Sequence, residues 1–334
     1  MRCFWQWLRG RFGVRYFDTK ARCSDDMRRV IIFLVALAAL PIIALLLASL
    51  GNSYFPLADS LAHFRAHYLV FLLLALLASA ILKATKLAAI VTVAIAIGLW
   101  STYPAWPGLS PFGLERQDGT SGQLKLVQFN TLFKNPTVDR SAQWILAQSP
   151  DFVMMQEVSS KTLAIHDQLG HDLPYGVVCK FATVGGVAVR SKHPIATQFC
   201  KEKEGFVWAQ VNVDGKAITL SSLHLHWPYP YGQWQQLQTL EADFRAMPRP
   251  VVLTGDFNAA PWSAAVSRVA NATDTSVVPG FRLTLRMGAA GLGPVPFLPI
   301  DQVLLPASAN VTEISAGPPI GSDHLPVIAE FTLE

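Results

Sequence analysis

Charge is scarce in this sequence, and internal repeats are absent from it. Asp, Glu, Lys and Arg make up 15% of the 334 residues, whereas hydrophobic residues make up 51%. An ordinary globular domain has about a quarter of its residues charged, so this composition excludes a typical soluble protein. The apolar residues are not spread evenly, because three long apolar stretches lie near the N-terminus.

These three stretches have the length of membrane helices. Residues 30–50 carry no charged side chain, and about 20 apolar residues in a helix cross a bilayer. We expect a membrane region at 30–103 with three transmembrane helices, at 30–50, 64–82 and 84–103. The first could instead be a cleaved signal peptide, but its apolar run is long and no small-x-small cleavage site is evident. The other two could be core helices of a soluble domain, but neither has a polar face.

Basic residues are absent from the loop 51–63, which separates the first two stretches. They are concentrated instead in residues 1–29 and in the "KATK" turn at Lys83–Lys86. Because basic loops stay in the cytoplasm, we expect residues 1–29 to be a basic cytoplasmic N-terminus and everything after Tyr103 to lie outside. The sequence thus predicts a multi-pass protein of the inner (cytoplasmic) membrane, with its large domain on the outer, periplasmic side.

A Pro- and Gly-rich linker at 104–122 leads to a domain at 123–334. Acidic residues slightly outnumber basic ones in this domain, and it lacks a basic cluster of the kind that tracks a phosphate backbone. This removes one argument for a nucleic-acid substrate without excluding it. The domain alternates strand-like runs, such as 251–254, with amphipathic stretches, such as 233–247. The pattern predicts mixed β-sheets covered by helices.

Polar side chains other than lysine stand at the ends of the predicted strands. They are Asn130, Glu157, His224, Asp256, Asn258, Asp301, Asp323 and His324. Any one of them could be an ordinary turn residue. Six separate strand ends of the same chemistry are harder to attribute to chance, and ligand sites form where such loops converge. We therefore expect these residues to gather at one edge of the sheets.

The strand ends carry short motifs in a recognisable order. The motifs are "QFNT" (128–131), "MQE" (155–157), "GGVAVRSKHPI" (185–195), "SLHLHWP" (222–228), "GDFNAAPW" (255–262), "PIDQVLL" (299–305) and "GSDHLPVIAEF" (321–331). In this order they resemble the endonuclease/exonuclease/phosphatase superfamily over about residues 124–333. The resemblance implies a four-layered α/β sandwich with two mixed sheets and a divalent metal in the cleft between them, here preceded by the three membrane helices.

By matched position, the resemblance implies a metal site with Glu157 as the principal ligand, assisted by Asn130 and Asp323. Oxygen ligands without thiolates favour a hard cation over zinc, so the expected cofactor is Mg²⁺ or Mn²⁺.

The resemblance also implies the catalytic residues. Asp256 orients or activates the attacking water, and Asn258 holds a phosphate oxygen. His324 contacts the phosphate or takes a proton, steered by Asp301. A carboxylate beside an imidazole fixes the tautomer and raises the basicity of the ring. His224 faces the leaving group.

Three functions stay open at this stage. The first is a membrane-tethered, metal-dependent phosphodiesterase or endonuclease-like hydrolase. The second is a phospholipid or small-molecule phosphate-ester hydrolase with the same site, which tethering near headgroups favours. The third is a non-catalytic membrane-bound binding module, against which the complete set of polar residues argues. The substrate is thus a phosphate ester, with nucleic acid or phospholipid undecided, and no protein partner is inferred. The aromatic run Trp227–Trp234 could be an exposed lipid-binding patch or a Pro-rich loop packed on the domain.

Two cysteines bear on the topology. Cys179 and Cys200 lie in the domain expected outside, where a disulfide could form. Two buried thiols are an equal alternative, because sequence does not give the distance between them. His193 and His226 match no catalytic position, and we expect them to be ordinary loop residues. Residues 279–297 are the least family-like stretch.

Overall fold

A computed structural model of the chain describes residues 13–106, 122–182, 184–288 and 293–334. The chain divides into two compact units, of which unit 1 comprises Met1–Ser49 and Arg65–Ser101. Unit 2 comprises Leu50–Phe64 and Thr102–Glu334. Residues 1–12 of the expected cytoplasmic N-terminus and residues 107–121 of the expected linker lie outside the described residues.

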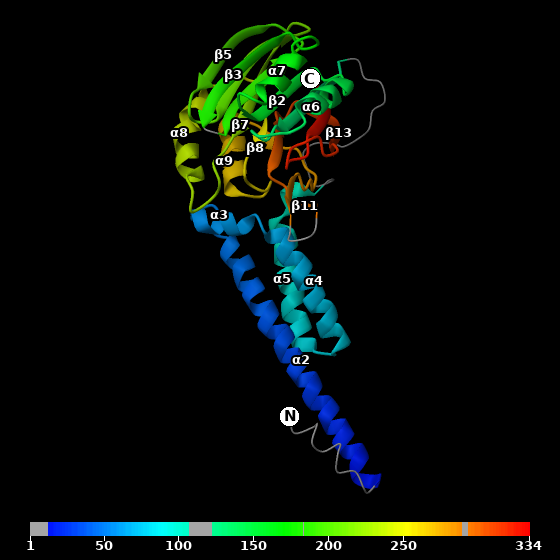
Figure 1. Cartoon of the computed structure of the whole chain (residues 1–334). Coiled ribbons are helices and arrows are strands. Elements are labelled where there is room, and N and C mark those ends of the chain that lie inside the picture. The colour runs from blue at the N-terminus through cyan, green and yellow to red at the C-terminus, as the bar shows by residue number, and fades with distance from the viewer. Residues whose placement is uncertain (1–12, 107–121, 183, 289–292) are drawn as a thin grey trace. The chain divides into compact units, whose positions relative to one another are not determined.

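Unit 2 contains two six-stranded sheets (Figure 1). The first has the order β13 (Ala309–Ala316), β14 (Val327–Leu333), β1 (Leu124–Asn130), β2 (Phe152–Val158), β4 (Gly185–Ser191) and β3 (Tyr175–Ala182). The second has the order β5 (Ile195–Lys201), β6 (Phe206–Val213), β7 (Lys216–His224), β8 (Val251–Asp256), β12 (Asp301–Leu305) and β9 (Ser276–Val277). A separate hairpin pairs β10 (Leu285–Gly288) with β11 (Pro294–Leu298).

Each sheet is mixed, because it combines antiparallel neighbours with a parallel pair. The parallel pairs are β1–β2 in the first sheet and β7–β8 in the second. A parallel pair needs a crossover connection, usually a helix. The crossovers here contain α6 (Val138–Ala147) between β1 and β2, and α8 (Gln233–Ala246) between β7 and β8. Each sheet therefore contains one strand–helix–strand connection. Residues of the candidate site lie at the ends of these parallel strands.

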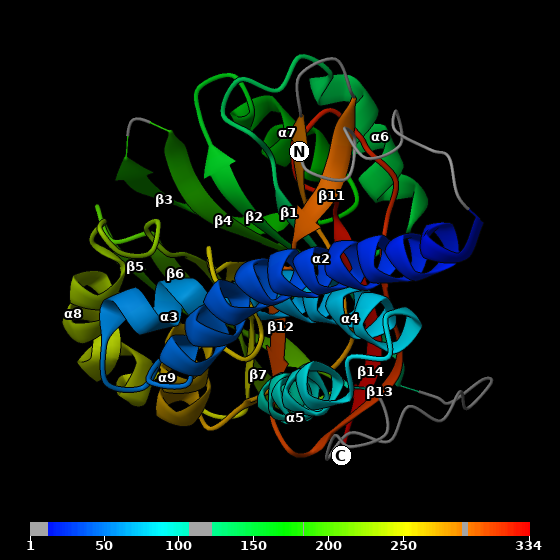
Figure 2. The same ribbon diagram turned by 90° about the horizontal axis from the view of Figure 1, so that it is seen from below.

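Three apolar clusters hold the layers of unit 2 together. Alternating strand residues such as Leu126, Phe152 and Val207 fill the space between the sheets. The outer face of the first sheet packs against α6 and α7 (Leu163–Leu169). The outer face of the second packs against α8 and α9 (Ala264–Thr273). Figure 2 shows both sheets between these helix layers. The prediction of an α/β fold with two mixed sheets is therefore confirmed.

A disulfide joins the two sheets at one edge. Cys179 on β3 and Cys200 on β5 are bonded, with their Cα atoms 5.5 Å apart. Both strands are edge strands of their sheets. A bridge closing a loop of this length stabilises a fold by about 3 kcal/mol in the chain-entropy description. Of the two alternatives left open by the sequence, the structure contains the bonded one.

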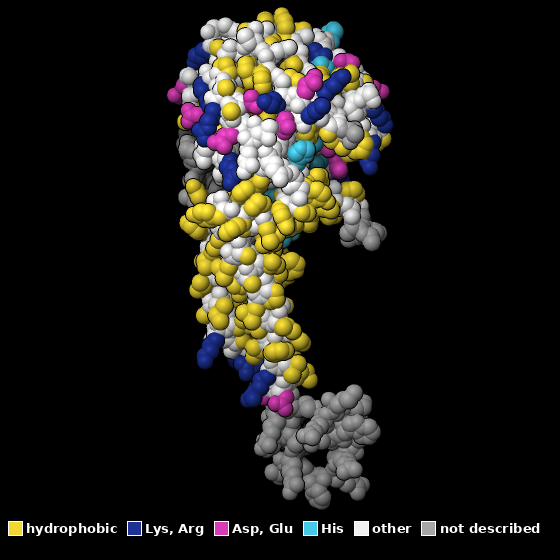
Figure 3. Space-filling view, turned by 90° about the vertical axis from the view of Figure 1, so that its left-hand side faces the viewer, with side chains coloured by type: hydrophobic (Ala, Val, Ile, Leu, Met, Phe, Trp, Pro, Cys, Tyr) yellow, Lys and Arg dark blue, Asp and Glu magenta, His cyan; other side chains and the backbone are white. Residues whose placement is uncertain are grey.

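Unit 1 is built from α2 (Gly13–Ser49), α4 (Arg65–Ile81) and α5 (Thr85–Ser101). Many of its large apolar side chains are exposed. Those with exposed side chains include Phe33, Leu37, Leu40, Leu47, Val70, Phe71, Leu74, Leu77, Ile90, Val93 and Trp100. Figure 3 shows hydrophobic side chains over most of the surface of these helices, with basic side chains near one end. Helices that are apolar on their outer surface are stable in lipid and unfavourable in water.

The prediction of three transmembrane helices is wrong for the described residues. One helix, Ser24–Ser49, is long and apolar enough to cross a membrane, and it contains most of the predicted span 30–50. The predicted span 64–82 begins as α4 only at Arg65, after a bend of 56° from α3 (Pro56–Ala62). The predicted span 84–103 is the 17-residue helix α5. Seventeen residues rise about 26 Å, less than the hydrocarbon core of about 30 Å.

Charged side chains mark the two ends of unit 1. Arg28 donates from Nε to the Leu82 carbonyl oxygen at 2.8 Å, which places it at the α4–α5 turn beside Lys83. The other end is held by Arg65, which is buried and donates to Ser49 Oγ at 3.0 Å and to the Ser101 carbonyl oxygen at 3.0 Å. A cation is favourable at helix C-termini, where carbonyl groups lack partners. Arg65 therefore joins the C-terminal ends of α2 and α5.

Candidate active site

The register of the second sheet brings three predicted residues together. His224, the last residue of β7, pairs with Asp256, the last residue of β8. Asp256 in turn pairs with Asp301, the first residue of β12. Because paired residues on neighbouring strands stand beside one another, these three side chains occupy adjacent positions at the end of the sheet where β7 and β8 terminate.

Gly255 explains why the "GDFN" motif begins with glycine. A Cβ atom at this position would lie 1.9 Å from the carbonyl oxygen of Leu223 on β7. Only a residue without a side chain allows the two backbones to approach this closely. The glycine thus lets β8 run against β7 up to the point where Asp256 begins the site.

The first sheet contributes Asn130 and Glu157 from the ends of its parallel pair. Glu157 adopts φ 55°, a left-handed conformation that is uncommon for a residue other than glycine. It lies in an irregularity of the β2–β4 pairing between Met155 and Val158. Its carbonyl oxygen accepts hydrogen bonds from the hydroxyls of Thr131 and Thr162, both at 2.9 Å. The strand end is therefore held in an unusual shape that aims the Glu157 carboxylate toward Asn130.

Asn130 connects the two sheets through its side-chain amide. Nδ2 donates to Asp256 Oδ2 at 2.9 Å and to Glu157 Oε1 at 3.2 Å. Its own Oδ1 accepts from the backbone N–H of Leu132 at 3.0 Å. The second carboxylate oxygen of Glu157 accepts from the backbone N–H of Phe133 at 2.9 Å. Asn130, Glu157 and Asp256 thus form one hydrogen-bonded group across the sandwich.

His324 and Asp301 form a buried imidazole–carboxylate pair. His324 Nδ1 lies 2.8 Å from Asp301 Oδ2, and His324 Nε2 lies 3.7 Å from Asp256 Oδ2. Burial lowers the pKa of His324, but the charges of Asp301 and Asp256 outweigh it and raise the pKa to about 10. Burial also raises the pKa of Asp256, and the charge of His324 opposes that rise. The imidazole is therefore protonated at neutral pH and balances the buried carboxylates in the metal-free protein.

Asn258 and His224 lie on either side of Asp256. Asn258 adopts φ 48° and donates its backbone N–H to Asp256 Oδ1 at 2.9 Å. Its side-chain amide donates to the Leu225 carbonyl oxygen at 2.8 Å, which uses one of its two N–H groups and leaves the second as a donor for a ligand oxygen. His224 Nε2 lies 3.5 Å from Asp256 Oδ2. His224 Nδ1 is buried without a hydrogen-bond partner in the described part of the chain.

Asp323 is the predicted site residue that the structure separates from the others. Its side chain is exposed, and its Oδ1 accepts only from Ser322 Oγ, at 3.3 Å, among the described residues. Its backbone carbonyl oxygen accepts from the N–H of Arg286 at 2.8 Å. The remaining seven predicted residues belong to the hydrogen-bonded or ion-paired groups described above.

Three buried polar residues support the site and were not expected from the sequence. Gln128 donates from Nε2 to Asp301 Oδ1 at 2.8 Å, so both oxygens of Asp301 have partners. Thr284 Oγ1 accepts from the backbone N–H of Asp301 at 3.3 Å. Arg282 is buried near Asp301, and burial lowers its pKa to about 10. Gln128 had a visible signal, because it is a polar residue between the apolar Val127 and Phe129 of a strand. Arg282 and Thr284 had none, because they lie in the least family-like stretch.

The donor atoms at the site fit a hard divalent cation. Ligand atoms of Asp256, Asp301 and His324 lie within 4.8 Å of one another and are buried. Both oxygens of Asp301 already accept hydrogen bonds, as described above, so we regard Asp301 as the partner of His324. Glu157 is partly exposed, and its carboxylate lies next to the Asn130 amide. These oxygen-bearing side chains, without a thiolate, suit Mg²⁺ or Mn²⁺.

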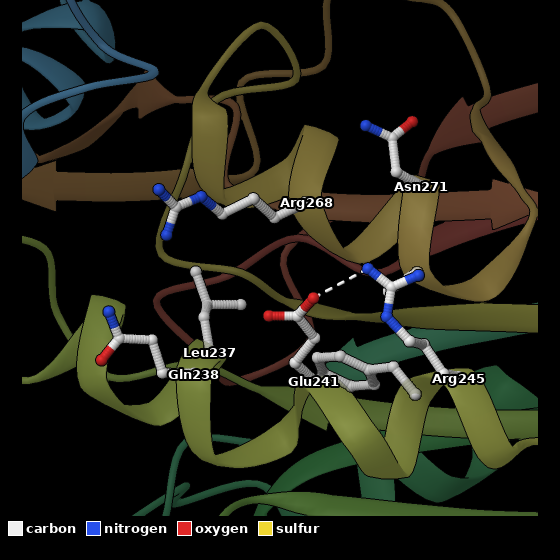
Figure 4. A pocket seen from close by; sticks show the side chains of 8 residues that line it. Leu237, Gln238, Glu241, Arg245, Arg268 and Asn271 are labelled. Atoms are coloured by element: carbon white, nitrogen blue, oxygen red, sulfur yellow. Dashed lines mark hydrogen bonds and ion pairs between the residues drawn. The ribbon is translucent and has the colours of Figure 1, made fainter.

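A hollow of about 240 Å³ lies elsewhere, between α8 and α9 (Figure 4). Its lining includes Leu237, Glu241, Arg245 and Arg268, and Glu241 forms an exposed ion pair with Arg245 at 2.7 Å. None of the predicted site residues lines it. An exposed ion pair between successive helix turns is weak, so this hollow has none of the buried carboxylates and imidazoles that mark the site.

Asn130, Glu157, His224 and Asp256 lie at the ends of the two parallel strand pairs, and the buried pair of His324 and Asp301 lies beside them. The sequence model of the Endonuclease/Exonuclease/phosphatase family matches residues 127–324, more than half of the chain. The chain therefore belongs to this family of hydrolases. A comparison with curated proteins finds no match.

Solved structures share the fold at low identity. The endonuclease/exonuclease/phosphatase from Bacteroides vulgatus is 20% identical with a TM-score of 0.51, covering 64% of this chain and 100% of that one. The endonuclease/exonuclease/phosphatase from Beutenbergia cavernae DSM 12333 is 20% identical with a TM-score of 0.50, covering 64% and 72%. Sphingomyelinase C from Streptomyces griseocarneus is 21% identical with a TM-score of 0.45, covering 63% and 99%. At these identities the likeness concerns the fold.

Proposed function

We propose that this protein is a membrane-anchored phosphodiesterase that uses Mg²⁺ or Mn²⁺ to hydrolyse phosphate esters. The observation that carries the proposal is the contact of Asp256 with groups from both sheets: Asn130 at 2.9 Å, His224 at 3.5 Å and His324 at 3.7 Å. Hydrolysis of a phosphate ester needs a positioned water, charge neutralisation on phosphate oxygens and a proton for the leaving oxygen. The Asp256 carboxylate can position the water, and the amide and imidazole groups beside it can contact the phosphate and the leaving oxygen.

In this proposal Asp256 orients the attacking water and accepts its proton. The Asn130 amide and the backbone N–H of Asn258 hold the Asp256 carboxylate in place. The Asn258 side chain holds a phosphate oxygen. His324, protonated and held by Asp301, contacts the phosphate, because a buried cation stabilises developing negative charge. His224 faces the leaving group.

The cation would be held by the Glu157 carboxylate and the side-chain oxygen of Asn130, two residues whose side chains lie next to one another at the ends of β2 and β1. A divalent cation supplies positive charge to the non-bridging phosphate oxygens. Asp323 keeps its proposed assisting role only if its exposed side chain turns toward Glu157 when the cation binds. Replacing Asp323 alone therefore tests its assisting role in holding the cation independently of Glu157.

The membrane anchoring rests on three observations. Unit 1 has an apolar outer surface, and α2 is long enough to cross a bilayer. Arg28 and Lys83 lie at the same end of this unit, and basic ends remain cytoplasmic. Cys179 and Cys200 form a disulfide in unit 2, and disulfides persist outside the cytoplasm. We therefore place the Arg28 end of α2 on the cytoplasmic side and unit 2 on the outer side of the inner membrane.

A phosphodiester of nucleic acid and a phospholipid are both compatible with the catalytic groups. Metal-dependent hydrolysis by the full chain, reconstituted in lipid nanodiscs, separates them when DNA, RNA, phospholipid and a generic soluble diester are offered in parallel. Glu157→Gln should lower the rate by at least about a hundredfold. The matched control is Glu313→Gln, an exposed carboxylate on β13, which should leave the rate unchanged. A folded protein that neither binds the cation nor hydrolyses any of these substrates would instead support the binding module.

A further inference from the structure

The segment between α2 and α4 is built into the catalytic unit. Its helix α3 carries Asp59, whose side chain is 1% exposed. Asp59 Oδ1 accepts from the backbone N–H of Ala264 at 2.7 Å, and Oδ2 accepts from the N–H of Ala265 at 3.1 Å. Oδ2 also accepts from Trp234 Nε1 at 3.2 Å. A carboxylate that satisfies the free N–H groups of a helix start is a strong anchor, so α3 is attached to the first turn of α9.

Further hydrogen bonds attach the same segment to the loops beside the site. Trp262 donates from Nε1 to the Ala62 carbonyl oxygen at 2.6 Å, and Asn52 donates to the Trp262 carbonyl oxygen at 3.3 Å. Ser60 Oγ donates to the Tyr229 carbonyl oxygen at 3.3 Å. The Trp262 ring is stacked on Phe281, with ring centres 6.1 Å apart. Residues 50–64 thus lie side by side with the loops 226–232 and 257–263 and with Phe281, and Figure 2 shows α3 next to α9.

This part of unit 2 exposes an unusual number of aromatic and aliphatic side chains. We call it the α3 face, and its exposed members are Tyr54, Phe55, Leu57, Tyr229, Tyr231 and Phe281. In the segments that form it, Asp59 and Arg282 are the charged residues, and both are buried. Exposed apolar patches of this kind mark interaction sites. Tyrosine with neighbouring aliphatic side chains and no charge is typical of a surface at the lipid headgroup level.

We propose that the α3 face rests on the headgroup layer of the membrane that α2 crosses. The chain between α2 and this face is short. Ser49 is the last residue of α2, and Tyr54 follows five residues later. A chain extends at most about 3.6 Å per residue, so Tyr54 lies within roughly 18 Å of the end of the membrane helix. At the other end of the segment, Phe64 directly precedes Arg65, the first residue of the apolar helix α4.

The α3 face adjoins the site through two short connections. Tyr229 follows His224 by five residues, and Trp262 follows Asn258 by four. Contact of this face with headgroups therefore keeps the edge of the sheets that bears Asp256 close to the membrane surface. The inference rests on the proposed anchoring by unit 1, and it does not depend on catalysis.

The test uses the full chain with Cys3→Ser and Cys23→Ser, reconstituted in phosphatidylcholine–phosphatidylglycerol vesicles at a low protein-to-lipid ratio. An environment-sensitive fluorophore is attached to Tyr231→Cys, on the α3 face. The matched control carries it at Asp214→Cys, an exposed position in the turn between β6 and β7. The vesicles contain a lipid with a spin-labelled headgroup, which quenches nearby fluorophores.

The proposal predicts quenching at position 231 that is about threefold stronger than at position 214, as expected for a residue at headgroup level. Equal and weak quenching at both positions overturns it. Weak quenching at position 231 that rises when the protein is diluted further in lipid also overturns it, because a second copy of the chain then covers the face at the working ratio. The measurement needs no substrate, so it remains informative if the proposed hydrolysis is not found.

Discussion

The side-chain amide of Asn130 donates a 2.9 Å hydrogen bond to Asp256 across the two sheets. These residues end strands that belong to different sheets and are 126 positions apart in the sequence. The contact therefore depends on the packing of the whole sandwich, and it fixes the position of the carboxylate that we propose to orient the water.

Asn130→Ala should lower kcat for a soluble diester by about a hundredfold, because Asp256 loses its cross-sheet donor and the proposed cation loses a ligand. The same variant should bind Mn²⁺ more weakly, as measured by calorimetry. Asn271→Ala, at an exposed position of α9, is the matched control and should change neither value. Unchanged kinetics in Asn130→Ala would remove the bridge from the mechanism.

Asp256→Asn should abolish hydrolysis while keeping the thermal unfolding midpoint near that of the wild type, because relief of the buried charge is offset by the loss of one of the two N–H hydrogen bonds that the carboxylate accepts. Asp256 is 2% exposed and burial raises its pKa, which means that its ionised form is unfavourable in the fold. A neutral amide of the same shape relieves this cost, although it cannot accept a proton from water. Thermal unfolding and a rate assay on the same sample check both parts. Retained activity would contradict the role of Asp256, and a large loss of stability would contradict the electrostatic argument.

His324 should make the metal-free protein less stable in alkaline solution. Its pKa is raised from an ordinary 6.5 to about 10, because the carboxylates of Asp301 and Asp256 outweigh burial. A raised pKa means that the folded state binds the proton more tightly than the unfolded chain. The resulting stabilisation is complete below about pH 6.5 and is lost as the pH rises through about 10.

The thermal midpoint in chelator should therefore fall more steeply between about pH 7 and 10 for the wild type than for His324→Gln. His171, an exposed histidine, offers the control variant His171→Gln, which should follow the wild type. Parallel curves for His324→Gln and the wild type would mean that the imidazole is neutral in the folded protein.

Asp59→Ala should destabilise unit 2 by about 1 to 3 kcal/mol, because two N–H groups of α9 and the Trp234 N–H lose their acceptor. The thermal midpoint should fall by roughly 2 to 10 °C, and Asp59→Asn should recover part of the loss. Asp214→Ala, at an exposed turn, is the control. A chain that begins at residue 123 should likewise be less stable than the full protein, since it lacks α3. Full stability of Asp59→Ala would show that α3 contributes nothing to the catalytic unit.

Much of the site could be predicted because its residues end strands. Asn130, His224 and Asp256 each follow an apolar strand run, and the ends of parallel neighbours meet at the same edge of a sheet. Their partners could not be predicted as easily. Gln128 donates to Asp301 across 173 positions of the sequence, and the charge of Asp301 acts on the buried Arg282. No local pattern encodes either relationship.

In the membrane region, the sequence predicted the presence of helices better than it predicted their ends. Apolar composition predicted helices in the right places, but their ends depend on tertiary contacts. α4 begins at Arg65, whose guanidinium donates to Ser49 and Ser101 in other parts of the chain. The loop 51–63 had no signal of its own beyond a lack of basic residues. Its attachment to α9 depends on one buried carboxylate, Asp59.

The most direct test of the central claim is to follow the oxygen of the attacking water. The full chain in nanodiscs is given Mn²⁺ and a soluble phosphodiester in ¹⁸O-water, and the products are analysed by phosphorus NMR and mass spectrometry. The account predicts metal-dependent release of a phosphate product that carries the ¹⁸O label, with no label in the alcohol, and loss of the reaction in Asp256→Asn. Label in the alcohol, or equal hydrolysis by Asp256→Asn, would contradict attack on phosphorus by a water that Asp256 orients.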